Sequence, residues 1–103
     1  MGFIEYTNVT LKMIIDSGLI EPDTKIYSSS QPEIIGNVKE DGTITLFIDN
    51  QDKVFYSPSG AARAVVNLSV NGWTFWKLLI DNKYLELSSL RELYNSKLKK
   101  GAI

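Results

Sequence analysis

The fold is decided by residues 55–76, which read FYSPSGAARAVVNLSVNGWTFW and contain both tryptophans of the chain. Ser57-Pro58-Ser59 is typical of a helix start, because the first serine can cap the helix and proline loses nothing at the first helical position. The helix is expected to end near Asn67, which tolerates the left-handed conformation. Asn71-Gly72 predicts a tight turn, and the apolar run 73–80 predicts a strand covered on both faces. Strand, helix, turn and strand therefore form one packing unit.

Length and composition favour one globular domain and exclude several kinds of chemistry. The chain has 103 residues, of which 44% are hydrophobic, so it can bury a core without stabilisation by disulfide bonds or a metal ion. It contains no cysteine and no histidine, which excludes disulfides, zinc fingers and Ser-His-Asp or Cys-His catalysis. We see no apolar run of membrane-spanning length and no signal peptide, so we expect a cytoplasmic protein without a membrane partner. Neither a metal nor a cofactor is expected.

The net charge of −1 is unevenly distributed along the chain. Residues 1–52 carry 3 Lys against 9 Asp and Glu, and residues 53–103 carry 8 Lys and Arg against 3 acidic residues. One interpretation is scatter over a solvated surface; the other is a basic face that contacts phosphates. That face would consist of Lys53, Arg63, Lys77, Lys83, Arg91, Lys97, Lys99 and Lys100. A near-neutral total argues against strong sequence-blind DNA binding.

Periodicity and turn signals predict the remaining elements. They are a helix over residues 8–18 capped by Thr7 or Asn8, a strand over 25–28, a hairpin of 34–40 and 43–49 around Asp41-Gly42, strands over 53–56 and 84–87, and a closing helix capped by Ser88 or Ser89. The fold class is α+β, a single small domain over 1–103 with a core of about 8–98. We expect a mainly antiparallel sheet of about five to six strands with three helices: N-terminal, central and C-terminal.

These landmarks together resemble the RAMA domain, the restriction enzyme and adenine methylase associated domain, over roughly residues 8–98. The motifs that carry the resemblance are Leu11 to Gly18-Leu19-Ile20, Asp23 to Tyr27, Asp41-Gly42-Thr43-Ile44, Tyr56 followed by Ser57-Pro58-Ser59-Gly60-Ala61-Ala62, Asn71-Gly72-Trp73, Phe75-Trp76, Leu90-Arg91 and Tyr94. The family usually has Gly after the central helix, where this chain has Asn67, the next-best residue for a left-handed cap.

The resemblance implies a non-catalytic module of restriction and modification systems that recognises modified DNA, N6-methyladenine in particular. DNA and an attached methylase or nuclease are the implied partners. Candidate residues for binding DNA or the modified base are Ser57, Ser59, Arg63, Asn71, Trp73, Trp76, Lys77 and Arg91. Serines at a helix start and nearby cations suit phosphate, whereas tryptophan suits base stacking.

Each candidate also has a purely structural explanation. Capping accounts for Ser57, the turn accounts for Asn71, and an internal salt bridge is the alternative for Arg91. Trp73 and Trp76 are three apart on the expected strand and would point to opposite faces, so at most one of them lines a given pocket.

Catalytic constellations are missing from the sequence. The glycines form no phosphate loop or dinucleotide fingerprint, no pair of carboxylates has catalytic spacing, and the Ser-x-x-Lys match at residues 96–99 lacks companion motifs. We therefore expect no enzyme. The alternative function is a protein-interaction or self-assembly module that uses exposed aromatics such as Phe47, Tyr84 or Tyr94.

Overall fold

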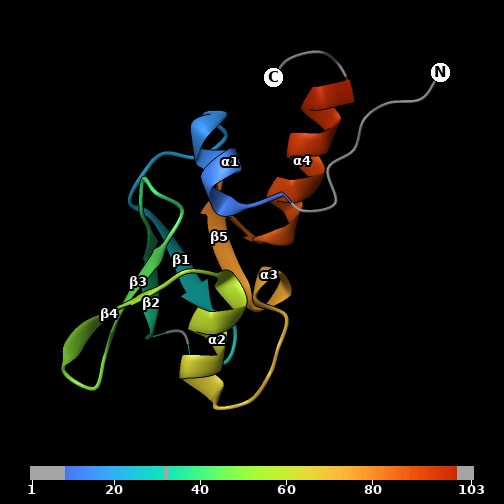
Figure 1. Ribbon diagram of the computed structural model, residues 1–103. Coiled ribbons are helices and arrows are strands. Elements are labelled where there is room, and N and C mark those ends of the chain that lie inside the picture. The colour runs from blue at the N-terminus through green and yellow to red at the C-terminus, as the bar shows by residue number, and fades with distance from the viewer. Residues whose placement is uncertain (1–8, 32, 100–103) are drawn as a thin grey trace.

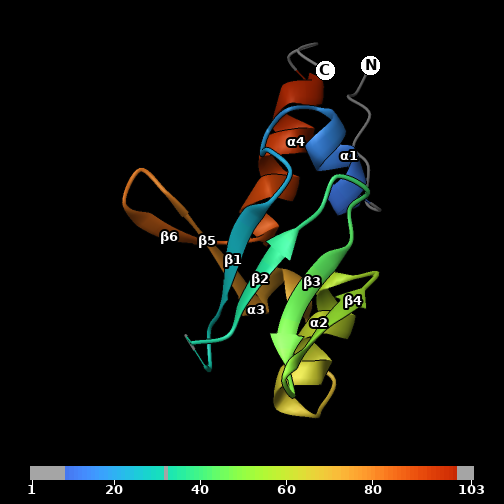
Figure 2. The ribbon, with the colours of Figure 1, turned by 90° about the vertical axis from the view of Figure 1, so that its left-hand side faces the viewer.

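The architecture is a sheet with helices on one face, seen in a computed structural model that describes residues 9–31 and 33–99 (Figures 1 and 2). Within those residues, six antiparallel strands form one sheet in the order β4-β3-β2-β1-β5-β6. In chain order the elements are α1 (Leu11–Asp16), β1 (Thr24–Ser28), β2 (Ile35–Val38), β3 (Ile44–Ile48), β4 (Gln51–Phe55), α2 (Pro58–Val66), α3 (Gly72–Phe75), β5 (Trp76–Ile80), β6 (Lys83–Glu86) and α4 (Ser88–Lys99). The predicted α+β class is confirmed.

Tight turns connect the strands. The predicted hairpin at Asp41-Gly42 is confirmed, and Gly42 has a φ of 86°. The β3–β4 and β5–β6 hairpins close with two-residue loops, Asp49-Asn50 and Asp81-Asn82, in which both residues have positive φ, whereas β1 and β2 pair across a longer connection. Such turns match the right-handed twist of the flanking strands, and Asp and Asn tolerate them well. These local signals account for the β2–β3 and β3–β4 connections of the β4–β3–β2–β1 meander.

The core lies between the sheet and its helical layer. Alternate strand residues such as Ile26, Val38 and Leu46 are fully buried on the inner face. The small side chains of Ala61 and Ala62 are also fully buried, which lets α2 approach the sheet closely. The other fully or nearly fully buried apolar residues include Leu11, Ile14, Ile44, Trp76, Leu78, Leu87 and Leu90.

The stretch around the tryptophans differs from its prediction. Residues 72–75 form the short helix α3 instead of the start of a strand, and β5 begins only at Trp76. Asn71 caps α3, because its side-chain oxygen accepts from the Trp73 amide at 2.9 Å and its carbonyl accepts from the Phe75 amide at 3.0 Å. The expectation that both tryptophans lie on one strand and point to opposite faces was therefore wrong, and the helix count rises to four.

Two helix starts also differ from their predictions. The first helix begins at Leu11, and the side chain of Thr10 caps it by accepting from the Met13 amide at 3.2 Å. The predicted caps Thr7 and Asn8 lie outside the described residues. The closing helix begins at Ser88, so the two predicted caps, Ser88 and Ser89, are both helical residues of its first turn and neither precedes the helix.

The outer face of the sheet carries no helix within the described part of the chain (Figure 2). Phe47 is 64% exposed there and Tyr84 is 63% exposed. Tyr84 packs edge-on against Tyr27, with ring centroids 5.7 Å apart. None of the described helices has the length and apolar character that crossing a bilayer requires.

Candidate functional site

Three contacts join the Ser-Pro-Ser motif to the segment 71–76, two of them through Gly72 and one through Trp76. The Ser59 hydroxyl oxygen accepts a hydrogen bond from the Gly72 amide at 2.9 Å. The Trp76 indole N–H donates to the Pro58 carbonyl at 3.0 Å. A Cβ on Gly72 would lie 2.1 Å from the Pro58 carbonyl carbon, so only glycine allows this approach. The start of α2 is therefore locked to α3 and β5, and Ser57 caps α2 by accepting from the Gly60 amide at 3.0 Å.

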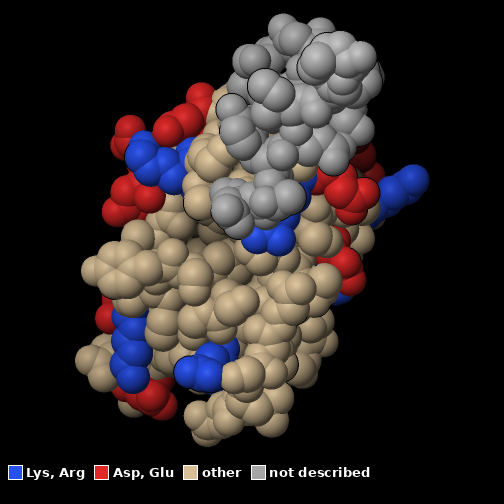
Figure 3. Space-filling view, turned by 45° about the vertical axis from the view of Figure 1, so that its right-hand side comes forward, with Lys and Arg blue, Asp and Glu red and all other residues tan. Residues whose placement is uncertain are grey.

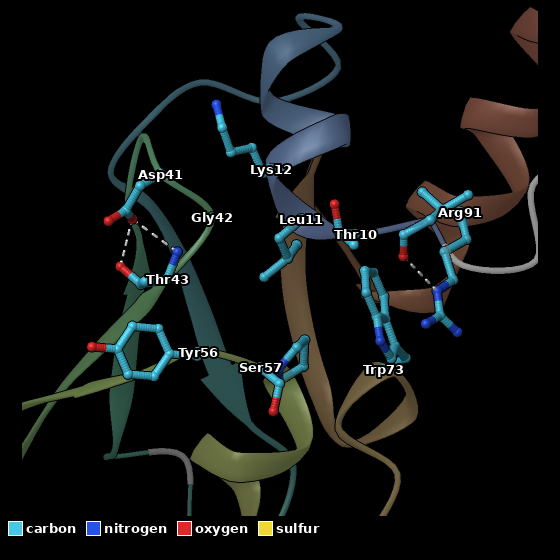
Figure 4. A pocket seen from close by; sticks show the side chains of 12 residues that line it. Thr10, Leu11, Lys12, Asp41, Gly42, Thr43, Tyr56, Ser57, Trp73 and Arg91 are labelled. Carbon is cyan, nitrogen blue, oxygen red and sulfur yellow. Dashed lines mark hydrogen bonds between the residues drawn. The ribbon is translucent and has the colours of Figure 1, made fainter.

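Above this junction lies a pocket of about 460 Å³ (Figure 4). Its walls come from five places far apart in the sequence: the start of α1, the β2–β3 turn, the start of α2, α3 and α4. The lining residues are Val9, Thr10, Leu11, Lys12, Asp41, Gly42, Thr43, Tyr56, Ser57, Pro58, Trp73 and Arg91. Its size is within the range of about 300–1,000 Å³ that small-molecule sites occupy.

Trp73 and Arg91 together form one wall of the pocket. The Arg91 guanidinium carbon lies 3.8 Å from the centroid of the Trp73 ring, a cation–π contact. The Arg91 Nε also donates to the Val9 carbonyl at 3.4 Å. Burial lowers the pKa of Arg91, which stays protonated at all physiological pH values. The structure shows these two contacts for Arg91. None of the ion pairs among the described residues involves its guanidinium.

The opposite wall contains Tyr56 and the β2–β3 turn. Tyr56 is 87% exposed, and Figure 4 shows Leu11 and Ser57 between it and Trp73, with the Tyr56 ring pointing away from Trp73. The Asp41 carboxylate accepts from the Thr43 hydroxyl at 2.6 Å and from the Thr43 amide at 3.0 Å. These hydrogen bonds, the hydroxyl first, lower the pKa of Asp41, so it stays ionised at the rim. A Cβ on Gly42 would lie 2.7 Å from the Lys12 amide nitrogen, which shows how closely this turn meets α1.

Three of the eight candidate residues line this pocket: Ser57, Trp73 and Arg91. Trp76 is fully buried in the core. Ser59 and Asn71 accept the hydrogen bonds from Gly72 and Trp73, and the exposed Arg63 donates to the Ser69 hydroxyl at 2.6 Å. Lys77 forms an ion pair with Glu86 at 3.3 Å on the outer face of the sheet.

Sequence reasoning missed Tyr56, Thr10 and Leu11 as pocket residues. Tyr56 had a signal, because it is the aromatic residue directly before Ser-Pro-Ser in the motif quoted above. Leu11 also begins one of the motifs quoted above, whereas Thr10 had no signal, since a helix cap occurs at the start of many helices.

The predicted basic face is divided between both edges of the sheet. Lys53 lies on β4 and Lys83 on β6, which are the two outermost strands. Lys53 forms an ion pair with Asp49 at 3.3 Å. Figure 3 shows separate groups of Lys and Arg on a largely uncharged surface, not one continuous stripe. The side chain of Lys99, and Lys100, lie outside the described residues.

Comparison with known proteins assigns the chain to a family. A search of curated proteins gave no significant match. The family profile described as RAMA, Restriction Enzyme Adenine Methylase Associated, matches residues 4–100, nearly the whole chain. The chain therefore belongs to the RAMA family, whose name associates it with restriction enzymes and adenine methylases.

Proposed function

We propose that this RAMA domain is a non-catalytic cytoplasmic module that binds DNA and reads a modified base, N6-methyladenine or a similar modification. Its context would be restriction and modification, attached to a methylase or nuclease partner. The proposal is supported most by the convergence of the family motifs. The Asp-Gly hairpin, the aromatic Ser-Pro start of α2, the Trp of Asn-Gly-Trp and the Arg of Leu-Arg all line the same pocket.

The pocket lining suits a flat, mainly apolar ligand. Trp73, Leu11 and Pro58 offer apolar surface, and stacking of a base on an aromatic ring stabilises binding by about 1–3 kcal/mol. A methyl group on the base adds only about 0.8 kcal/mol when it is buried. Discrimination of a modified base therefore depends on the shape of the slot, which rigid walls such as the Trp73–Arg91 pair provide.

Charges near the pocket suit the DNA backbone. Arg91 lies at one wall and Lys12 at another, although Lys12 also forms an ion pair with Asp16 at 3.0 Å and the ionised Asp41 carboxylate lies at the rim. Few cations are close to the pocket. We therefore expect phosphate contacts to contribute modestly to the binding free energy, and the affinity for DNA to fall only slowly as the salt concentration rises.

The test is the affinity of the domain for one duplex with and without N6-methyladenine, measured at two salt concentrations. Tighter binding of the modified duplex at both concentrations supports the proposal. Equal binding of both duplexes contradicts the reader role. If the affinity is equal and also falls steeply with salt, the domain binds DNA through phosphate contacts only.

A second candidate function is protein interaction or self-assembly through the outer face of the sheet. Phe47 and Tyr84 are exposed there, whereas Tyr94, which the sequence also suggested, is buried. Sedimentation of the isolated domain tests self-assembly, and Phe47→Asp is the matched variant. A monomer at all concentrations, unchanged by that variant, contradicts self-assembly.

A further inference from the structure

The outer face of the sheet collects most of the exposed apolar side chains of the domain (Figure 2). Eight large apolar residues are exposed among those that the structure describes. Five of them lie on strands and alternate with residues that face the core, so they point to the outer face: Ile35, Phe47, Val54, Leu79 and Tyr84. A patch of this kind marks an interaction surface, because soluble monomers rarely expose one.

Strand register arranges part of this face as one row across all six strands. Tyr27 lies opposite Ile35 on one side and opposite Lys77 on the other. The β2–β3 register, continued by one residue, sets Ile35 beside Phe47. From β4 to β6 the row reads Asp52, Phe47, Ile35, Tyr27, Lys77 and Glu86. Three apolar or aromatic residues therefore form the middle of the row, and charged residues flank them.

The row is self-complementary about β2. Phe47 and Tyr27, both aromatic, lie one strand away from β2 on opposite sides. Asp52 and Lys77, of opposite charge, lie two strands away on opposite sides. A rotation by half a turn about β2 therefore brings each residue onto a chemically matching one.

The two charges of the row can each take a partner from outside the chain. Asp52 forms no ion pair within the described part of the chain. The Lys77 ammonium donates to the Thr74 carbonyl at 3.2 Å and to Glu86 at 3.3 Å. An ammonium group has three donors, so one of them is left for a further carboxylate.

We propose that the outer face binds the outer face of a second copy of this chain, across a two-fold axis that runs along β2. This inference rests on the second candidate function above and specifies its partner. The axis sets β3 of one copy against β1 of the other, and β4 against β5. Ile35 then meets its own counterpart, and Phe47 meets Tyr27 of the second copy. Asp52 meets Lys77 of the second copy.

The next row of side chains agrees with this axis. Strands β4 and β5 run in the same direction, because three antiparallel strands separate them. Val54 lies two residues beyond Asp52, and Leu79 lies two residues beyond Lys77. Val54 is 54% exposed and Leu79 is 46% exposed. The same axis therefore sets these two apolar side chains against each other and removes both from water.

The position of the axis follows from the charges. An axis between β2 and β1 would set β4 against β6, and Asp52 would then meet the like charge of Glu86. A two-fold interface uses one patch twice, so it must be self-complementary, and the match about β2 meets this condition. An axis along the strands also keeps the strands of two twisted sheets aligned, as in β-sandwiches.

The size of the face predicts a weak dimer. Five strands overlap, so the contact is about 24 Å wide, and strands of five residues make it about 17 Å long. Because side chains stand out from the sheet, we expect a total burial of about 1,000 Å², near the lower limit of specific interfaces. We expect a dissociation constant of about 10–100 µM.

Sedimentation equilibrium of the isolated domain, from about 10 µM to about 1 mM, measures this association. Phe47→Asp should raise the dissociation constant at least about tenfold, because it buries an unpaired charge. Leu68→Asp is the matched control, since Leu68 is 60% exposed in the connection between α2 and α3. It should leave the dissociation constant unchanged. Thermal unfolding of each variant confirms that it is folded.

A charge exchange tests the position of the axis. Asp52→Lys and Lys77→Glu should each raise the dissociation constant about fivefold or more, because each sets like charges against each other. The double variant should recover most of the affinity. Within one chain these positions lie on strands about 19 Å apart, beyond the screening length of salt, so recovery requires contact between two copies.

The outcomes separate this inference from the reading of DNA. The pocket is lined mainly by residues of the helical layer, on the other side of the sheet, so Phe47→Asp should leave binding of a modified duplex unchanged. A monomer at every concentration overturns the dimer, even if it prefers modified DNA. A dimer that Phe47→Asp does not weaken overturns this face as its interface. A double charge variant that stays as weak as the single ones overturns the axis along β2. A dimer that responds as expected but binds all duplexes equally supports this inference and contradicts the reader role.

Discussion

The indole N–H of Trp76 donates to the carbonyl oxygen of Pro58 at 3.0 Å, and the Trp76 side chain is fully buried. Pro58 is the first residue of α2 and Trp76 the first residue of β5. One hydrogen bond therefore joins the beginnings of two elements that are separated by the whole of α2 and α3. It assigns Trp76 to the core and leaves Trp73 for the pocket.

Replacing Trp76 should cost more stability than any other single substitution in this region. We expect Trp76→Ala to lower the free energy of unfolding by about 3–5 kcal/mol, because it leaves a large cavity. Trp76→Phe should cost about 1–3 kcal/mol, since it removes the donor and part of the volume. Urea denaturation measures both, with the exposed Phe47→Ala as a control expected within about 0.5 kcal/mol of the parent. A Trp76→Ala protein as stable as the control would contradict its place in the core.

Gly72→Ala should destabilise the domain through the backbone contact with Pro58. The added methyl would lie 2.1 Å from the Pro58 carbonyl carbon, so α2 and α3 must separate. We expect a loss of about 1–3 kcal/mol or more in the free energy of unfolding. Gly60→Ala is the matched control within α2, where the nearest atom to the methyl is the Ser57 hydroxyl oxygen at 3.2 Å. That change should stay within about 1 kcal/mol. Similar losses for both variants would argue against the close contact.

Ser57→Ala and Ser59→Ala should separate two roles of neighbouring serines. Losing the α2 cap at Ser57 should cost about 0.5–2 kcal/mol. Losing Ser59 leaves the amide of the buried Gly72 without its acceptor, which should cost about 1–3 kcal/mol. Thermal or urea unfolding measures both. A Ser59→Ala protein with full stability and weakened DNA binding would instead favour a phosphate contact by Ser59.

The Asp41 carboxyl should titrate below its ordinary pKa, because the Thr43 hydroxyl and amide both donate to it. A carboxyl with a lower pKa in the folded state than in the unfolded state stabilises the fold above its unfolded pKa. That stabilisation is lost as the pH falls through the folded pKa, below about 3.9. Carboxyl-carbon NMR titration should show the low midpoint, and Thr43→Val should raise it. An unchanged midpoint in Thr43→Val would contradict the role of the hydroxyl.

Arg91→Met should loosen the Trp73 wall while it keeps much of the packing volume. The cation–π contact, at 3.8 Å, should contribute about 0.5–2 kcal/mol. Fluorescence in a background without the second indole, such as Trp76→Phe, should report a changed environment of Trp73. Arg91→Lys keeps the charge but loses the planar stacking, so it should recover only part of the stability. Full recovery by lysine would show that charge alone matters.

Local chemistry made much of the fold predictable. Ser57 and Pro58 begin α2 and Asn67 ends it with a φ of 60°, as their residue types indicate. Asp41-Gly42 closes the expected hairpin. These features depend on a few adjacent residues, so a short stretch of sequence is enough to predict each of them.

The pocket and α3 were not predictable from local patterns. Asn71 caps residues 72–75 locally, and Gly72 in addition lies against the backbone of Pro58, 14 positions earlier, which no local pattern shows. An apolar run with two tryptophans also suits a buried strand, and over four residues periodicity cannot distinguish a helix from a strand. The pocket is assembled from Thr10, Tyr56, Trp73 and Arg91, and no sequence spacing shows that these positions meet.

The hydrogen bond from Arg91 to the carbonyl of Val9 joins residues 82 positions apart. Because Val9 and Arg91 both line the pocket, a ribosome must release nearly all of the described chain before the pocket can close. The sheet also needs a distant contact, because β1 pairs with β5 through Tyr27 and Lys77. A fragment that ends before α4 lacks the Arg91 wall, so we expect it to bind no ligand in this pocket.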